Sequence, residues 1–164
     1  MSTSTFTISY THTVTYVTAK MLLLLKEIIR EIGLDPSKLT DDWASYEAAM
    51  SAWLTSRHLQ KVTLEVYDPT SDKLITRWDL DVEYAAAGDG TLWVDTAAIR
   101  YQILKAGLVA SSCRYQIKLM SPGGREVSGW GPVPFRSTQG FNRYCIGATI
   151  AGNGISTQAA YWGR

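Results

Sequence analysis

The sequence has few of the features that mark disulfide-rich, membrane or secreted proteins. Its only cysteines, Cys113 and Cys145, lie 32 positions apart, which fits two reduced thiols better than a disulfide framework or a zinc site. The longest apolar run, from Met21 to Leu25, is far shorter than the roughly 20 residues of a membrane span. The first residues lack the basic and apolar segments of a secretory signal. We therefore expect a cytoplasmic protein without a membrane partner.

An excess of charge of either sign is also absent. Lys and Arg number 16 against 15 Asp and Glu, giving a formal net charge of +1 and a pI near 7.7. Binding to phosphate backbones needs a clustered basic face, so we expect no direct nucleic-acid partner. The hydrophobic fraction is 46%, and the 164 residues match the size of one typical domain. The composition therefore predicts one folded domain.

Apolar spacing predicts helices in the first third of the chain. Large apolar residues recur every three or four positions from about Thr11 to Ile32, which favours a helix despite the β-branched residues near its start. Gly33 is suited to end this helix. A second helix is expected to begin at Thr40, as a hydroxyl cap, with an apolar face made of Trp43, Tyr46, Met50, Trp53 and Leu54.

The apolar spacing then changes to the alternation that is typical of strands. Val62–Val66 and Leu74–Val82 flank a polar turn and predict a hairpin. A third helix is expected at Thr96–Ala106, capped by Asp95. Cys113–Met120 alternates again and predicts a strand with Tyr115, Ile117 and Leu119 on one side.

The last quarter of the chain combines many breakers with many large apolar residues. Glycines and prolines interrupt every potential element from Ser121 onward, so we expect neither a compact helix nor a strand there. A solvated linker would not contain so many large apolar side chains. The tail must therefore pack on the rest of the protein, and it is long enough to pack in more than one way. These apolar residues are Trp130, Phe135, Phe141, Tyr144, Ile146, Ile150, Tyr161 and Trp162.

Three acidic residues are the best candidates for chemistry. Asp79, Asp81 and Glu83 lie two apart on a predicted strand, so they share one face and are suited to hold a divalent metal. The simpler interpretation, which we favour, is that these acids face water while the residues between them face the core. The two histidines, His12 and His58, are isolated from any recognisable nucleophile. We therefore expect no catalytic residue, no metal and no cofactor.

Several segments, in the same order and over nearly the whole chain, are similar to one known family. They include Tyr10–Thr18, Gly33–Pro36, Trp53-Leu54, Asp72–Leu74, Thr76–Asp79, Trp93–Thr96, Gly129-Trp130, Phe135–Thr138, Gly140 and Tyr161-Trp162. On these segments the chain resembles the bacterial HORMA-domain proteins of cyclic-oligonucleotide antiphage signalling (CBASS) systems.

The resemblance implies an α+β fold and a peptide-binding site. A single HORMA domain over residues 1–164 would have three helices packed on an antiparallel sheet in residues 1–120. Residues 121–164 would form a C-terminal safety belt. In the closed state of such proteins the belt surrounds a closure-motif peptide of a partner protein, which joins the sheet as a strand. The residues expected to contact this peptide are Tyr115, Ile117, Leu119, Trp130, Phe135, Arg136, Ser137 and Phe141.

The resemblance also implies two protein partners. In its closed state the domain would bind and activate a cGAS/DncV-like nucleotidyltransferase, and an AAA+ remodelling ATPase would reopen it by pulling the N-terminal segment. The residues engaged by the ATPase would then be Ser2, Thr3, Ser4 and Thr5, unless this segment is an edge strand or a frayed end. The expected function is a non-catalytic signalling adaptor. The alternatives are a small metal-dependent nucleotide-handling enzyme using the three acids, and a structural assembly subunit.

Overall fold

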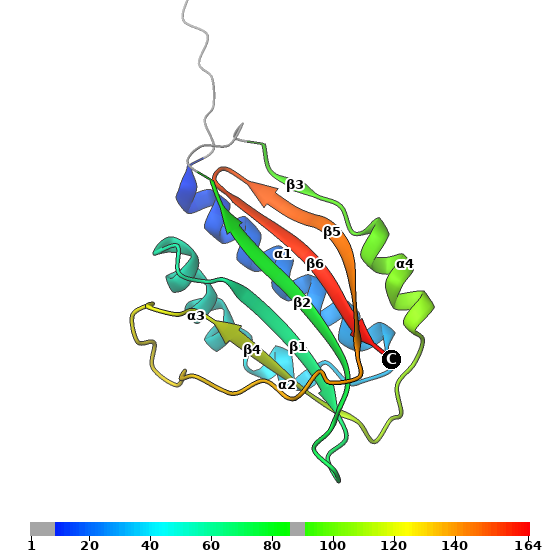
Figure 1. Ribbon diagram of the computed structural model, residues 1–164. Helices are drawn as coiled ribbons and strands as arrows, with labels where there is room; N and C mark the ends of the chain where they lie inside the picture. The colour runs from blue at the N-terminus through cyan, green and yellow to red at the C-terminus, as the bar shows by residue number, and fades with distance from the viewer. Residues whose placement is uncertain (1–8, 86–90) are drawn as a thin grey trace, which may run out of the picture.

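The computed structural model describes residues 9–85 and 91–164, which fold into one layer of helices and one sheet (Figure 1). The helices are α1 (Tyr10–Glu31), α2 (Ser37–Asp41), α3 (Trp43–Thr55) and α4 (Ala97–Ala106). The strands are β1 (Lys61–Tyr67), β2 (Leu74–Tyr84), β3 (Trp93–Val94), β4 (Arg114–Met120), β5 (Asn142–Gly152) and β6 (Ile155–Gly163). They form one antiparallel sheet in the order β3-β5-β6-β2-β1-β4. The α+β prediction is therefore confirmed.

Helix α1 lies behind the sheet in Figure 1 and supplies much of the core. Its predicted apolar stripe is confirmed, because Val17, Met21 and Leu25 are completely buried. The Ser9 hydroxyl caps the helix by accepting a hydrogen bond from the His12 amide at 3.1 Å. Gly33 follows the helix with a φ of +92°, the left-handed conformation expected of a glycine at a helix end.

The predicted start of the second helix is wrong. Helix α2 begins at Ser37, and the Thr40 hydroxyl donates to the Ser37 carbonyl at 3.1 Å inside that short helix. Residues 37–41 already form this separate short helix, with Pro36 at its N-cap, and the apolar face predicted for the second helix belongs to α3, which begins at Trp43. The N-cap of α4 is Thr96, one residue after the predicted Asp95, whose carboxylate accepts from the Ala97 amide at 2.9 Å.

The prediction for the tail is wrong from residue 142 onward. Strands β5 and β6 form a long antiparallel hairpin, and β6 pairs with β2 inside the sheet. Two glycines that argued against strands lie where a hairpin needs them. Gly147, with a φ of +114°, follows a register shift in β5, and Gly154, with a φ of +79°, lies in the turn between the strands.

The polypeptide from 121 to 141 connects β4, at one margin of the sheet, to β5, the neighbour of the other margin strand β3. It leaves the end of β4, turns outward, and then runs back across the face opposite α1 to reach β5 (Figure 1). We call this segment the belt. No helix in the described ranges 9–85 and 91–164 is long and apolar enough to cross a membrane.

Candidate functional site

Strand β4 forms one margin of the sheet and pairs only with β1 among the described strands. The Met120 carbonyl accepts from the Gln60 amide at 2.8 Å, so the Met120 peptide groups point toward the β1 side. Peptide groups alternate along a strand. The N–H and C=O groups of Tyr115, Ile117 and Leu119 therefore point to the open edge of β4. An extended peptide can hydrogen-bond to these groups without displacing any strand of the sheet.

The side chains of these three residues point toward the helices instead. Tyr115 and Ile117 are 7% and 5% exposed. The Tyr115 hydroxyl donates to the Asp35 carbonyl at 2.9 Å and accepts from the Leu39 amide at 3.3 Å. Burial raises the pKa of the Tyr115 phenol above its usual value. These contacts fix β4 to the connection between α1 and α2 and hold its open edge rigidly.

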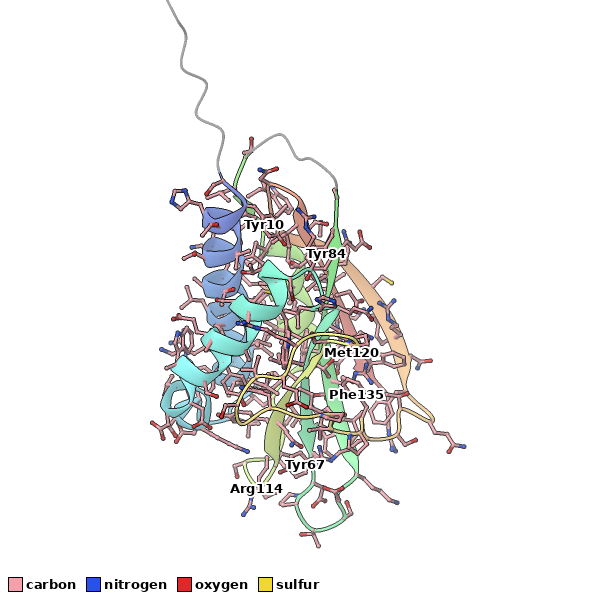
Figure 2. All side chains as sticks on the ribbon, turned by 90° about the vertical axis from the view of Figure 1, so that its left-hand side faces the viewer. Tyr10, Tyr67, Tyr84, Arg114, Met120 and Phe135 are labelled. Atoms are coloured by element: carbon pink, nitrogen blue, oxygen red, sulfur yellow. The ribbon has the colours of Figure 1, made fainter. Side chains whose placement is uncertain are left out.

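An apolar cavity of about 380 Å³ lies between the belt and the C-terminal end of β4. Leu119, Trp130 and Phe135, three of the residues expected to contact a peptide, line it together. Its other lining residues are Trp53, Met120, Ser121, Pro122, Gly124, Arg125, Glu126, Gly131, Pro132 and Val133. Figure 2 shows Phe135 beside Met120 at this end of β4, with Arg114 at the opposite end. The cavity continues the open edge of β4 and is suited to large apolar side chains.

The outward half of the belt is held against α3 by aromatic contacts. The Trp130 ring packs edge-on against Tyr46, with ring centroids 5.1 Å apart, and against Trp53 at 6.4 Å. Its indole donates to the Ser45 hydroxyl at 3.2 Å, and the Trp53 indole donates to the Arg125 carbonyl at 2.8 Å. Trp130 therefore fixes the wall of the cavity as well as lining it.

The returning half of the belt is held by a buried ion-pair cluster on the outer face, the face of the sheet opposite α1. Glu65 of β1 is completely buried there and accepts from the Lys118 ammonium at 2.6 Å. Arg136 of the belt donates to the same carboxylate through its amide at 2.8 Å and its guanidinium at 2.7 Å. That guanidinium also lies 3.6 Å from the ring centroid of Tyr67 and pairs with the exposed Asp72 at 2.9 Å. Arg136 is thus the main polar anchor of the belt.

A second buried carboxylate anchors the C-terminal hairpin on the same face. Asp79 is 1% exposed and forms a two-bond pair with Arg77 at 2.8 and 3.0 Å. It also accepts from the Thr63 hydroxyl and from the Trp162 indole, both at 2.9 Å. The Arg77 guanidinium lies 4.7 Å from the ring centroid of Phe135 and 5.3 Å from that of Trp162. The belt, through Phe135, and the hairpin, through Trp162, therefore both contact Arg77.

The expectation that all three acids face water is wrong for Asp79, because the belt and the hairpin cover it. Asp81 is half-buried and pairs with Lys61 at 3.5 Å and with Arg143 at 3.1 Å. Glu83 is exposed. Within the described residues no group of three or more His, Cys, Asp or Glu side chains is arranged to hold a metal ion. The first two acids serve as ion-pair partners.

The other predicted site residues lie apart from the open edge. Ser137 is exposed and accepts from the Gln139 amide at 3.2 Å, and Phe141 packs against Arg164 at 4.8 Å. Both line a separate pocket of about 400 Å³ together with Asp72 and Leu74. The predicted N-terminal handle, Ser2, Thr3, Ser4 and Thr5, lies outside the described residues. Both cysteines are free, as predicted.

Sequence reasoning missed the two carboxylates that hold the belt and the hairpin. One signal was present in the register of the strands. In the β1–β2 hairpin Glu65 lies opposite Arg77, and Thr63 lies opposite Asp79 on β2 and opposite Lys118 on β4. Charged residues of opposite sign on one strand face can neutralise one another under a cover. The local sequence around these residues does not indicate that the belt packs over them.

The fold and the site define an α+β protein in which an irregular segment after the edge strand β4 lines a cavity at the end of that strand. The family model described as bacterial HORMA domain 2 matches residues 1–164, and the chain belongs to this family. The earlier resemblance is thereby confirmed. A comparison with curated proteins gives no match.

Solved structures share the fold at low sequence identity. A chain of the mitotic checkpoint complex is 12% identical with a TM-score of 0.74, covering 92% of this chain and 98% of that one. HTP-2 of C. elegans bound to HTP-3 closure motif 1 is 11% identical with a TM-score of 0.65, covering 96% and 88%. An E. coli MS115-1 CdnC:HORMA-deltaN complex contains a chain that is 16% identical with a TM-score of 0.55, covering 98% and 90%.

Proposed function

We propose that this protein is a non-catalytic adaptor that captures a closure-motif peptide of a partner protein between β4 and the belt. The observation that supports this most directly is the open edge of β4. The outward peptide groups of Tyr115, Ile117 and Leu119 lead toward the apolar cavity, which the belt lines. A peptide added as a strand gains backbone hydrogen bonds from the edge and selectivity from the cavity. The closure-motif complex of the similar C. elegans protein supports the same use of the fold.

The captured state would bind and activate a nucleotidyltransferase of the cGAS/DncV-like class in antiphage signalling. The similar E. coli HORMA chain was solved in a complex with CdnC, which supports this partner. An AAA+ remodelling ATPase would then reopen the belt, acting through the N-terminal segment. In this scheme the domain itself hydrolyses no ATP and works by binding.

The first experiment selects a tight-binding peptide from a random library and measures hydrogen exchange with and without it. We expect new protection in residues 113–120 and in the belt, because strand addition occupies the open edge while the belt covers the peptide. Unchanged exchange in both segments, with no peptide selected, would contradict the proposal. Self-assembly as the sole interaction would favour the structural subunit instead.

The second experiment tests the geometry of the edge through the peptide. Each amide of the selected peptide is methylated in turn, which removes one donor at a time. Strand addition requires that every second methylation weakens binding strongly and that the intervening ones have little effect. Because the protein is unaltered, its folding is not in question. A loss without this period of two would exclude strand addition on β4.

The enzyme partner is tested by reconstitution. A cGAS/DncV-like nucleotidyltransferase is assayed for cyclic oligonucleotide synthesis with the domain alone, the peptide alone, and both together. We expect synthesis only with both, and its reversal when an AAA+ remodelling ATPase and ATP are added. Full synthesis without the domain would contradict the proposal that the domain activates the enzyme. It would not affect the proposal that the domain binds a peptide.

A further inference from the structure

The two buried carboxylates of the outer face share an arrangement that the peptide site does not require. Glu65 and Asp79 both belong to strands of the sheet, and both accept hydrogen bonds from the C-terminal part of the chain. Arg136 of the belt binds Glu65, and Trp162 of the hairpin binds Asp79. One carboxylate therefore binds the belt, and the other accepts a side-chain bond from the hairpin, whose strand β6 also pairs with β2.

Each carboxylate also has a cation of its own on the sheet. Lys118 of β4 pairs with Glu65 at 2.6 Å, and Arg77 of β2 pairs with Asp79 at 2.8 Å. If the belt and the Trp162 side chain leave the outer face, both carboxylates keep these partners. A buried charge without a partner is strongly destabilising, and this arrangement avoids it. The contacts of Arg136 and Trp162 can therefore break and re-form while the sheet stays folded.

The two attachment points are connected through Phe135. Its ring lies 4.7 Å from the Arg77 guanidinium and 5.6 Å from the Lys118 ammonium, so it covers the cations of both carboxylates. The Trp162 ring contacts Arg77 as well, at 5.3 Å. Lys118 also donates to the Pro134 carbonyl of the belt. Release of the belt therefore exposes the cation on which the hairpin packs, and the two attachments favour each other.

We propose that Glu65 and Asp79 are positioning residues of a reversible two-point latch, which acts through Arg136 and Trp162 and sets how long a captured peptide stays bound. The latch lies on the outer face, whereas the peptide groups that select the ligand lie on the edge of β4. Breaking the latch therefore accelerates dissociation and leaves the choice of peptide unchanged. The part of this inference that concerns the peptide rests on the proposed function.

The test uses changes on the C-terminal segment, because these leave the pairs inside the sheet intact. Arg136→Met removes the guanidinium bonds to Glu65 and Asp72, and it keeps the backbone amide bond to Glu65 and the Glu65–Lys118 pair. Trp162→Phe removes the indole donor to Asp79 and keeps an aromatic ring. Arg143→Met is the matched control, since this arginine also joins the hairpin to β2 but pairs with the half-exposed Asp81 at the rim. Arg136→Lys keeps the charge and loses the planar fork.

Binding kinetics of the selected peptide give the main measurement. Arg136→Met loses buried hydrogen bonds to a charged group, so we expect the peptide to dissociate about tenfold faster or more. We expect the association rate to change by less than about threefold. Trp162→Phe is expected to give a smaller acceleration, and Arg136→Lys partial rescue. Arg143→Met is expected to stay within about twofold of the wild type. Equal acceleration by Arg143→Met, or slower association without faster dissociation, would overturn the latch.

A second measurement separates failure of the latch from failure of the proposed function. Hydrogen exchange of the belt and of β5 and β6 is recorded in the free protein, together with exchange in β1. Arg136→Met is expected to raise exchange in the belt and hairpin by about tenfold and to leave β1 protected. Unchanged exchange in the belt and hairpin would overturn the latch even where a peptide binds. If the wild type binds no peptide, the proposed function fails and this measurement still decides the latch.

Discussion

The two faces of the sheet differ in how they are covered. The face toward α1 is covered by apolar side chains that come early in the chain, among them Val17, Leu25 and Ile28. The outer face is covered in part by the belt and carries buried Glu65 and Asp79 in ion pairs. Apolar burial is non-directional, whereas each ion pair requires a partner at one position. The first face therefore gives stability, and the second gives a specific and reversible arrangement of the belt.

The largest effect should come from a cavity on the helix-facing side. Leu25→Ala removes a completely buried side chain of α1, and we expect a loss of about 3 to 4 kcal/mol in the free energy of unfolding. Denaturant unfolding measured by circular dichroism checks this value. Because the whole core is affected, exchange should rise in α1 and in β1 alike. A rise in hydrogen exchange confined to the belt would contradict the conclusion that the helix-facing side of the sheet provides the stability.

The next effect should come from the cation inside the outer face. Lys118→Met removes the sheet partner of Glu65, and the remaining cation, Arg136, belongs to the belt. We expect a loss of about 2 to 3 kcal/mol in the free energy of unfolding, since the carboxylate then depends on a movable partner.

Glu65→Gln combined with Lys118→Met is the matched control for that loss. The double change removes both buried charges, so we expect it to recover part of the lost stability. Unfolding free energies of the two single variants and the double variant complete the cycle. Strictly additive losses would show that the two side chains do not act as a pair.

The sequence predicted the helix-facing side well because its signals are local. The stripe from Val14 to Ile32 has the period of a helix, and the β1–β2 hairpin shows the alternation of strands on either side of a turn. The strand that carries Tyr115 was also predicted correctly, and the structure places the Tyr115 side chain toward the helices. Such patterns depend on neighbours within a few residues.

The outer face was less predictable because its signals are distant in sequence. Arg136 lies 71 residues from Glu65, and Trp162 lies 83 residues from Asp79. A polar strand face indicates exposure unless another segment covers it, and the covering belt has no regular pattern of its own. The hairpin was missed for a related reason, since Gly147 and Gly154 are typical of loops until their strand partners are known.

The contacts of the belt on α3 should give a smaller and local effect. Trp130→Ala removes the ring that packs against Tyr46 and Trp53. We expect about 1 kcal/mol less stabilisation of the belt, the range of an aromatic pair, and little change in global unfolding. Proteolysis within residues 121–141 is a suitable readout, because a loosened belt is cleaved faster while the sheet stays intact. Unchanged cleavage would mean that Arg136 alone holds the belt.

The smallest effect should come from the exposed partner of Arg136. The Asp72 side chain is 73% exposed and pairs with the same guanidinium that reaches the buried Glu65. Because water screens an exposed pair, Asp72→Asn is expected to change belt exchange by less than about threefold. The effect should shrink further as salt is raised, since screening by ions is stronger at the surface. A loss as large as that of Arg136→Met would show that the arginine is held mainly at the surface, and the buried carboxylate would then no longer explain why the belt lies on this face.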